Sequence, residues 1–186
     1  MGTIFTYVAD DALTSIEDAC CHVCGCDDVP IYDAQGDIEQ GDEELDVSEA
    51  CAKCIKTGKI IPTCEFELHE VIRKYIANHQ KSEGTELEAY LIAARRRTPS
   101  APTHVQREDW PLCCDDLTEY RGPATAADGL LLKTQGTYWN GEPQNPQGRR
   151  RIDVEELVAE PLAVLGAVNV FRCLHCASLY WTFQHT

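Results

Sequence analysis

Eight cysteines in four close pairs are the residues of this chain most able to do chemistry. The pairs are Cys21 and Cys24, Cys51 and Cys54, Cys113 and Cys114, and Cys173 and Cys176. Two thiolates at Cys-x-x-Cys spacing can converge on one metal ion, and Gly25 behind the first pair allows the sharp turn of a metal knuckle. Structural zinc takes four ligands, mostly sulfur, so the four pairs predict two zinc sites.

The first predicted site joins Cys21 and Cys24 to Cys51 and Cys54. The pattern C-x2-C-x26-C-x2-C is close to that of zinc ribbons, in which each knuckle lies at the tip of a β-hairpin. Four thiolates leave no open position for water, so this site is expected to stabilise the fold. Cys26 is close enough in sequence to replace one ligand.

The second predicted site joins Cys173 and Cys176 to Cys114. Its fourth ligand is either Cys113 or a histidine such as His175 or His104, because two adjacent residues seldom both reach one ion. An iron–sulfur cluster is the alternative cofactor for both sites, since four thiolates suit it as well.

Recognised enzyme signatures do not occur in the sequence. A three-thiolate site with an open position would indicate a metal-dependent enzyme, but the deaminase pattern H-x-E…P-C-x-x-C does not occur. Neither a phosphate loop, nor a dinucleotide-binding glycine motif, nor a G-x-S-x-G elbow is present. The pattern therefore favours a binding protein over an enzyme.

Eleven cysteines among 186 residues also bear on the cellular compartment. The N-terminal residues lack the basic start and apolar stretch of a secretory signal, and no run of 18 apolar residues predicts a membrane span. Cysteines in such a chain favour metal ligation in a reducing compartment over disulfides. We expect a cytoplasmic protein that does not enter a membrane.

The formal net charge of −15 is concentrated at one end of the chain. Residues 1–70 hold 17 acids and 3 lysines, a net charge of −14, whereas residues 71–186 hold 14 acids and 13 bases. Repulsion by phosphates argues against direct nucleic-acid binding, and a basic protein partner would be attracted. Solubility alone is the other explanation for an acidic surface.

Seven of these acids lie close together, and we expect them to contact the partner. They are Asp37, Glu39, Asp42, Glu43, Glu44, Asp46 and Glu49. With little apolar content between them, residues 37–49 are predicted to be an exposed loop.

Two helices are predicted between the second and third cysteine pairs. An apolar face that includes Phe66 recurs at helical spacing over residues 65–80. Thr85 and Glu88 form a capping-box pattern for a second helix, which Thr98-Pro99 ends.

The remaining predicted elements are mostly strands. They cover residues 29–32, 130–132, 137–139, 164–172 and 179–183, with a short helix over 152–161. The predicted class is α+β: a β-rich, zinc-ribbon-like knuckle scaffold with two inserted helices and a short helix in the C-terminal half. Residues 1–186 are expected to form one domain, with an acidic zinc-ribbon-like part (1–64), a helical pair (65–98) and a second metal-knuckle part (99–186).

The ordered set of motifs resembles the CbrC family, also called UPF0167 or the colicin-tolerance family. The resemblance covers the first knuckle with Gly25, the second pair followed by Gly58, the Arg97-Thr98-Pro99 stop, the stretch from Gln106 to Trp110, and the ending from Phe171 to Cys176. The family pattern Trp-x-x-His-Cys-x-Asp-x-Cys-x-Phe-x-Gly is matched here at Trp110, Cys114, Asp116 and Gly122, with Cys113, Thr118 and Tyr120 as departures. Residues 128–163 are not covered by this pattern.

This resemblance implies a cytoplasmic bacterial protein linked to tolerance of a DNA-cleaving colicin. The leading hypothesis is an immunity or tolerance protein that neutralises a basic toxin, such as a nuclease, by binding it through the acidic segment. A zinc-ribbon adaptor in a stress response is the second hypothesis, and a metal-dependent or redox enzyme is the third.

Overall fold

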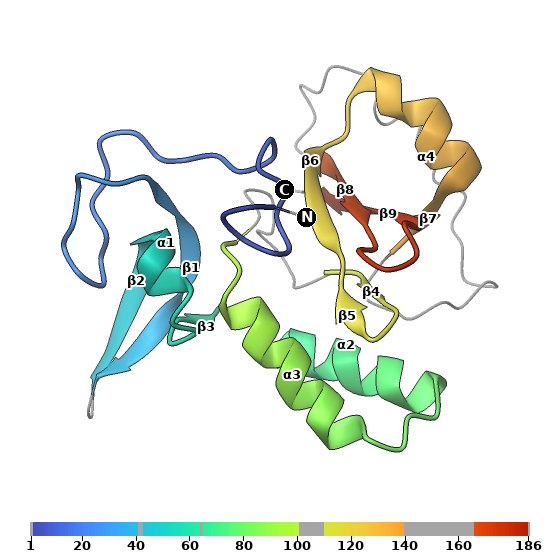
Figure 1. Cartoon of the computed structure of the whole chain (residues 1–186), viewed down its shortest axis with the longest axis horizontal. Coiled ribbons are helices and arrows are strands. Elements are labelled where there is room, and N and C mark those ends of the chain that lie inside the picture. The colour runs from blue at the N-terminus through green and yellow to red at the C-terminus, as the bar shows by residue number, and fades with distance from the viewer. Residues whose placement is uncertain (1, 41–42, 64, 101–109, 140–165, 186) are drawn as a thin grey trace.

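The computed structural model describes residues 2–40, 43–63, 65–100, 110–139 and 166–185. Within them it has four α-helices, one 3-10 helix and nine strands. The strands form three sheets, ordered β2-β1-β3, β4-β5 and β6-β8-β9-β7. Figure 1 shows the first sheet on one side, the β6-β8-β9-β7 sheet on the other, and a pair of helices below them. The mixed α and β content agrees with the predicted class.

The first sheet is built on a long antiparallel hairpin. Strand β1 (Ile31–Gln40) pairs with β2 (Glu43–Cys51), and the short β3 (Ile61–Pro62) lies along the other edge of β1. The prediction of an exposed loop over residues 37–49 is therefore wrong. Acidic and apolar residues alternate here, as in Asp37-Ile38-Glu39, and this period of two places the apolar residues on one face.

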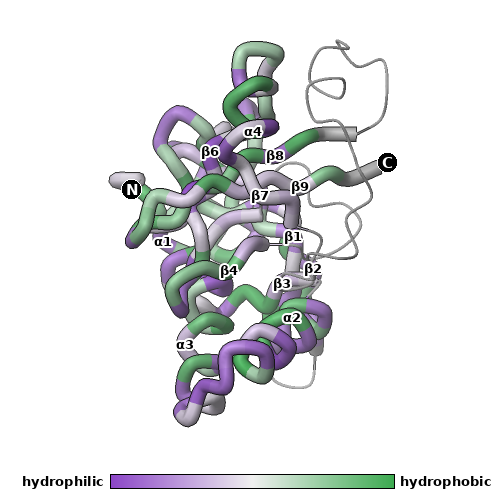
Figure 2. The backbone as a smooth tube through the Cα atoms, turned by 90° about the vertical axis from the view of Figure 1, so that its right-hand side faces the viewer, coloured by the Kyte–Doolittle hydropathy of each residue, from purple (hydrophilic) through white to green (hydrophobic). Residues whose placement is uncertain are grey.

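The two long helices lie where the sequence predicts them. Helix α2 spans Glu65–Asn78 and α3 spans Gly84–Arg96, and Figure 2 shows that the turn joining them is hydrophilic. Two details differ from the prediction. Thr85 lies inside α3, whose N-cap is Glu83 without a side-chain cap, and Phe66 is 74% exposed instead of buried.

Basic residues at the end of α3 anchor it to its neighbours. Arg96 forms a bidentate salt bridge with the buried Glu65. Its Nε donates to Oε2 and its Nη2 donates to Oε1, each at 2.6 Å. Arg95 is buried over the ring of Trp110 and donates from Nη1 to the Thr98 carbonyl at 3.0 Å. These two arginines therefore stabilise the packing of α3.

The C-terminal sheet places β8 (Gly166–Arg172) between β6 (Glu119–Pro123) and β9 (Leu179–His185). The short β7 (Gly136–Tyr138) runs parallel to β9 at the opposite edge. The sequence predicts a strand over residues 130–132, but they belong to helix α4 (Gly129–Gln135), which follows a 3-10 helix, η1 (Ala126–Asp128). The predicted helix over residues 152–161 lies outside the described residues.

A shared apolar core connects these elements. Rings of Trp110, Tyr120 and Phe171 pack at centroid distances of 5.4 to 6.4 Å, and all three are fully buried. The N-terminal segment joins them, because Tyr120 donates its backbone N–H to the Tyr7 carbonyl at 2.8 Å. Among the described helices, none is long and apolar enough to cross a membrane.

Candidate metal centres

The structure brings the eight paired cysteines into two clusters of four. The first centre consists of Cys21, Cys24, Cys51 and Cys54, and the second consists of Cys113, Cys114, Cys173 and Cys176. Within each centre, the four Sγ atoms all lie within 4.8 Å of one another. In both cases, two segments far apart in sequence supply two sulfurs each.

A tight turn positions the first two sulfurs of the first centre. The Gly25 N–H donates to the Cys21 carbonyl at 2.7 Å, and the Cys21 N–H donates to the Cys26 carbonyl at 2.8 Å. Gly25 has a φ of +72°, in the left-handed region that side chains disfavour. The glycine behind the cysteine pair is therefore required by the backbone.

The end of the hairpin supplies the other two sulfurs. Cys51 is the last residue of β2 and directly precedes the short helix α1 (Ala52–Ile55), which carries Cys54. The His22 N–H donates to the Glu49 carbonyl at 3.0 Å and so holds the knuckle against β2. Cys24 Sγ consequently lies 3.9 Å from Cys51 Sγ.

The second centre depends on a two-residue hairpin turn. Strands β4 (Leu112–Cys113) and β5 (Asp116–Leu117) are joined by Cys114 and Asp115, which have φ of +54° and +63°. Two consecutive left-handed residues are the mark of a type I′ turn. This geometry lets adjacent cysteines serve one cluster: Cys113 Sγ lies 3.8 Å from Cys114 Sγ and 3.5 Å from Cys176 Sγ.

The turn between β8 and β9 carries the remaining sulfurs. The backbone N–H groups of His175 and Cys176 point at Cys173 Sγ, at 3.4 and 3.5 Å. The Cys173 N–H donates to the Ser178 carbonyl at 2.9 Å, which closes the turn. The turn thus fixes the position of Cys173 Sγ relative to the rest of the knuckle.

The fourth sulfur of the second centre belongs to Cys113, one of the candidates that the sequence offered for this position. His175 instead points at Asp116, with Nε2 2.9 Å from Oδ2. His104 lies outside the described residues. No described histidine is part of either cluster.

The hairpin of the second centre is held by a buried polar network. Asp116 is 8% exposed, and its Oδ1 accepts hydrogen bonds from the hydroxyls of Tyr7 at 2.7 Å and Tyr90 at 3.0 Å. Asp115 accepts from the Tyr75 hydroxyl at 3.1 Å and from Lys81 Nζ at 2.7 Å, and Lys81 lowers the pKa of Asp115. Sequence patterns do not predict these tyrosines as partners of the turn, because only the fold brings them to it.

Electrostatics within the two centres favour a bound cation. Burial raises the pKa of Cys54 and of Cys113 well above that of a free thiol, and neighbouring sulfurs add to the effect. Burial also acts on Cys21, but backbone N–H donors outweigh it and lower the pKa to about 6. Hydrogen bonds from Ser178 lower the pKa of Cys176 to about 6. Four thiolates so close together repel one another, and a divalent cation removes this repulsion.

Three sulfur–sulfur distances, one in the first centre and two in the second, are compatible with a single tetrahedral ion. In a tetrahedral site with Zn–S bonds of about 2.3 Å, neighbouring sulfurs lie about 3.8 Å apart. The Sγ–Sγ distances of 3.9, 3.8 and 3.5 Å are close to this value. A polynuclear iron–sulfur cluster places cysteines on different irons and so needs a wider set of sulfurs.

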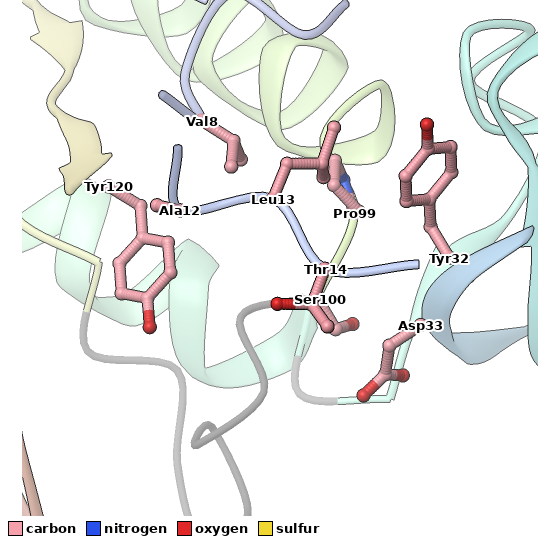
Figure 3. A pocket seen from close by; sticks show the side chains of 9 residues that line it. All are labelled: Val8, Ala12, Leu13, Thr14, Tyr32, Asp33, Pro99, Ser100 and Tyr120. Atoms are coloured by element: carbon pink, nitrogen blue, oxygen red, sulfur yellow. The ribbon is translucent and has the colours of Figure 1, made fainter. Parts of the chain in front are cut away.

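A separate small cavity lies beside Asp33, between the N-terminal segment, β1 and Ser100 (Figure 3). Its volume is about 20 Å³, enough for one water molecule and too small for an organic ligand. Asp33 Oδ1 is buried and has no hydrogen-bond partner among the described residues. Burial raises the pKa of this carboxyl. This cavity therefore offers no substrate site.

The predicted partner-binding acids gather on the hairpin. Asp37 pairs with Asp46 and Glu39 with Glu44 across the two strands, and Glu39, Glu44 and Asp46 are exposed. Glu43 belongs to β2, Glu49 lies near the knuckle, and Asp42 lies outside the described residues.

Comparison with models of protein families identifies a family that the chain matches. The model of an uncharacterised protein family, UPF0167, matches residues 4–185, a range that includes all eight cysteines of the two centres. Searches of curated proteins and of solved structures found no match.

Proposed function

The chain belongs to the uncharacterised protein family UPF0167, and we propose that it is a zinc-stabilised acidic protein that binds a basic protein partner. In this proposal two structural zinc ions hold the scaffold and the acidic hairpin is the docking surface. The two clusters of four sulfurs are the observation that carries the proposal.

The donor set supports zinc in a structural role. Each centre offers four cysteine sulfurs, which fill all positions of a tetrahedral ion and leave none for a substrate. Bound zinc supplies a cross-link between distant segments, and the ligand residues then hold the knuckles against β2 and against the β4-β5 turn. A catalytic site would need an open position, so we propose a binding protein and not an enzyme.

The hairpin supports an interaction with a basic partner. Like charges directly opposite each other on neighbouring strands are destabilising. This hairpin nevertheless sets Asp37 against Asp46 and Glu39 against Glu44 on one face, while Ile38 and Val47 are buried on the other. A face that carries four acids at a cost in stability is well suited to attract cationic side chains.

The family resemblance suggests which partner to test. Carboxylates presented to a basic nuclease would occupy positions that nucleic-acid phosphates otherwise take, which is the chemistry of an immunity protein. An adaptor for another cytoplasmic protein is the second candidate. It predicts binding that persists when the hairpin charges are removed.

Elemental analysis tests the metal part. Protein purified without chelators is expected to contain two zinc ions per chain, and a strong chelator is expected to unfold it. A folded protein that contains no metal would contradict the proposal.

Calorimetry tests the partner part. The probe is the purified nuclease domain of a DNA-cleaving colicin, titrated at low and high salt. The test variant carries D37N, E39Q, E44Q and D46N; the matched control neutralises four exposed acids elsewhere, Glu17, Glu70, Glu83 and Glu86. Binding that is lost in the test variant and kept in the control supports the hairpin. If the unmodified protein does not bind the nuclease domain at low salt, the toxin hypothesis is wrong.

A further inference from the structure

A fifth sulfur lies beside the first centre. Cys26 is two residues beyond Cys24, and their Sγ atoms are 3.4 Å apart. This is closer than the 3.9 Å between the ligand pair Cys24 and Cys51. Cys26 is not part of the set of four sulfurs that lie within 4.8 Å of one another. The first centre therefore has one sulfur more than an ion needs.

Cys26 and the ligand Cys24 are accessible to solvent, whereas the remaining three cysteines of the first centre are not. Cys24 is exposed and Cys26 is partly exposed, whereas Cys21, Cys51 and Cys54 are buried. The two more exposed cysteines lie on the knuckle turn. The hydrogen bond from the Cys21 N–H to the Cys26 carbonyl closes this turn, and Gly25 lies between Cys24 and Cys26 with a φ of +72°.

We propose that Cys24 and Cys26 form a redox-reactive pair through which a hydroperoxide opens the first centre. This inference rests on the proposed binding of zinc by that centre. Its basis is the contact between two accessible sulfurs, one of which is a ligand and the other a spare.

The chemistry balances with a hydroperoxide as the oxidant. One thiolate of the pair attacks the peroxide oxygen and becomes a sulfenic acid, with hydroxide or alkoxide as the leaving group. The other thiol then displaces water from that sulfur, and the disulfide forms. Two electrons pass from the two sulfurs to the peroxide, and the zinc ion keeps its charge.

Oxidation would take one ligand away and weaken the centre. With Cys24 in a disulfide, only Cys21, Cys51 and Cys54 still face the ion. The knuckle would remain tied to β2 through the hydrogen bond from the His22 N–H to the Glu49 carbonyl. We therefore expect a local loosening of the knuckle, with release of one zinc ion, and no global unfolding.

Among the described residues, the second centre has no spare sulfur of this kind. Its neighbours Cys113 and Cys114 are both members of the cluster of four. In the part of the chain that the structure describes, only the first centre has a spare cysteine beside it. A disulfide mapped to Cys24 and Cys26 would therefore report oxidation of the first centre.

The experiment begins with protein whose zinc content has been measured. A value of two ions per chain before oxidation establishes the metal part of the proposed function independently of this inference. Dilute hydrogen peroxide is then added, zinc release is followed with a chromogenic chelator, and the disulfide is mapped by mass spectrometry. We expect release of one ion along with a Cys24–Cys26 disulfide, and rebinding of the ion after treatment with a thiol reductant.

Two serine variants make a matched pair. Cys26→Ser removes the spare sulfur, whereas Cys20→Ser removes an exposed cysteine of the same segment. The Cys26→Ser protein is expected to keep two ions and to release zinc at least about tenfold more slowly. The Cys20→Ser protein is expected to behave like the unmodified protein.

Three results would overturn the inference. Equal rates of zinc release with and without Cys26 would do so, as would a disulfide that maps to another pair. Loss of zinc from Cys26→Ser before any peroxide is added would show that Cys26 is itself a ligand. Mapping in the unmodified protein keeps the test decisive if that variant does not fold.

Discussion

His175 Nε2 lies 2.9 Å from Asp116 Oδ2, and this contact joins the two segments that supply the second centre. Asp116 follows the turn of Cys113 and Cys114, while His175 lies between Cys173 and Cys176. The contact therefore holds the two sulfur pairs in register from outside the cluster. Contacts that orient the ligands of a metal site contribute to its affinity.

Replacing Asp116 with alanine is expected to weaken metal binding at the second centre only. The change removes the acceptor shared by His175, Tyr7 and Tyr90, and affinity should fall about tenfold or more. Chelator competition, followed as two separate release steps, measures this. Asp128→Ala is the control, since that carboxylate bonds only to Thr125 among the described residues. Equal weakening of both centres would indicate general destabilisation instead.

Removing two sulfurs of one centre should remove one ion. The double variant C113S/C173S is expected to retain one zinc ion per chain, because only the first centre keeps four sulfurs. Elemental analysis and limited proteolysis check the metal content and the order around the β4-β5 hairpin. Cys20→Ser should retain two ions, because Cys20 belongs to neither cluster. Two retained ions in the double variant would refute the assignment of the second centre.

Zinc binding should release protons at neutral pH. Burial raises the pKa of Cys54 and Cys113, so these residues carry protons in the metal-free protein and lose them to the ion. Cys21, with a pKa of about 6, stays a thiolate until the pH falls through that value, and its contribution is then lost. Affinity should therefore fall as the pH is lowered. Titrations in buffers of different ionisation enthalpy count the protons, and a count of zero would contradict the thiol assignment.

Asp33→Asn is expected to stabilise the protein at neutral pH. Burial raises the pKa of Asp33 above 3.8, so the folded state favours the protonated acid and is weakened as the pH rises through the folded pKa. The asparagine side chain does not ionise, so the variant does not lose this stability. The advantage of the variant should be present at pH 7 and vanish when the pH falls below the ordinary value of 3.8. Denaturant unfolding at several pH values checks this, and a variant less stable at pH 7 would show that the charge of Asp33 is needed.

Relief of the like-charge pairs on the hairpin should also stabilise the fold. Asp46→Asn removes the repulsion from Asp37, and we expect a gain of about 0.2–1 kcal/mol at low salt. The gain should shrink in high salt, which screens the same repulsion in the unmodified protein. Glu17→Gln, which removes an exposed acid outside the hairpin, is the control. Identical effects of the two variants would mean that only net charge matters.

The cysteine spacing predicted the candidate centres well, because ligand geometry limits how sulfurs can be arranged. Cys51 and Cys54 had to meet Cys21 and Cys24 for a four-sulfur site to exist, and the structure brings these four together. The role of Cys113 was harder to predict. A cysteine pair without a spacer can share one cluster only if the chain adopts the left-handed turn at Cys114 and Asp115, a conformation that aspartate tolerates but cysteine does not favour.

Two predictions about the fold are wrong for different physical reasons. Counting acids over residues 37–49 suggested a loop, but alternation of Asp37, Ile38 and Glu39 was the stronger signal, because burial of Ile38 decides the structure. Three consecutive leucines suggested a strand, although they form part of α4 and only Leu132 is buried. The local sequence thus contained the signal for the hairpin, whereas tertiary packing decided the structure of the leucine segment.

The separation of the ligands in each centre also determines when each could assemble during synthesis. Cys24 and Cys51 are 27 residues apart, so the first set of thiols leaves the ribosome early and nearly together. Cys113 and Cys176 are separated by 63 residues, and Cys113 must wait unpartnered until translation has passed that distance. Under the proposed binding of zinc, a limited supply of the metal should therefore affect newly made molecules before it affects mature ones.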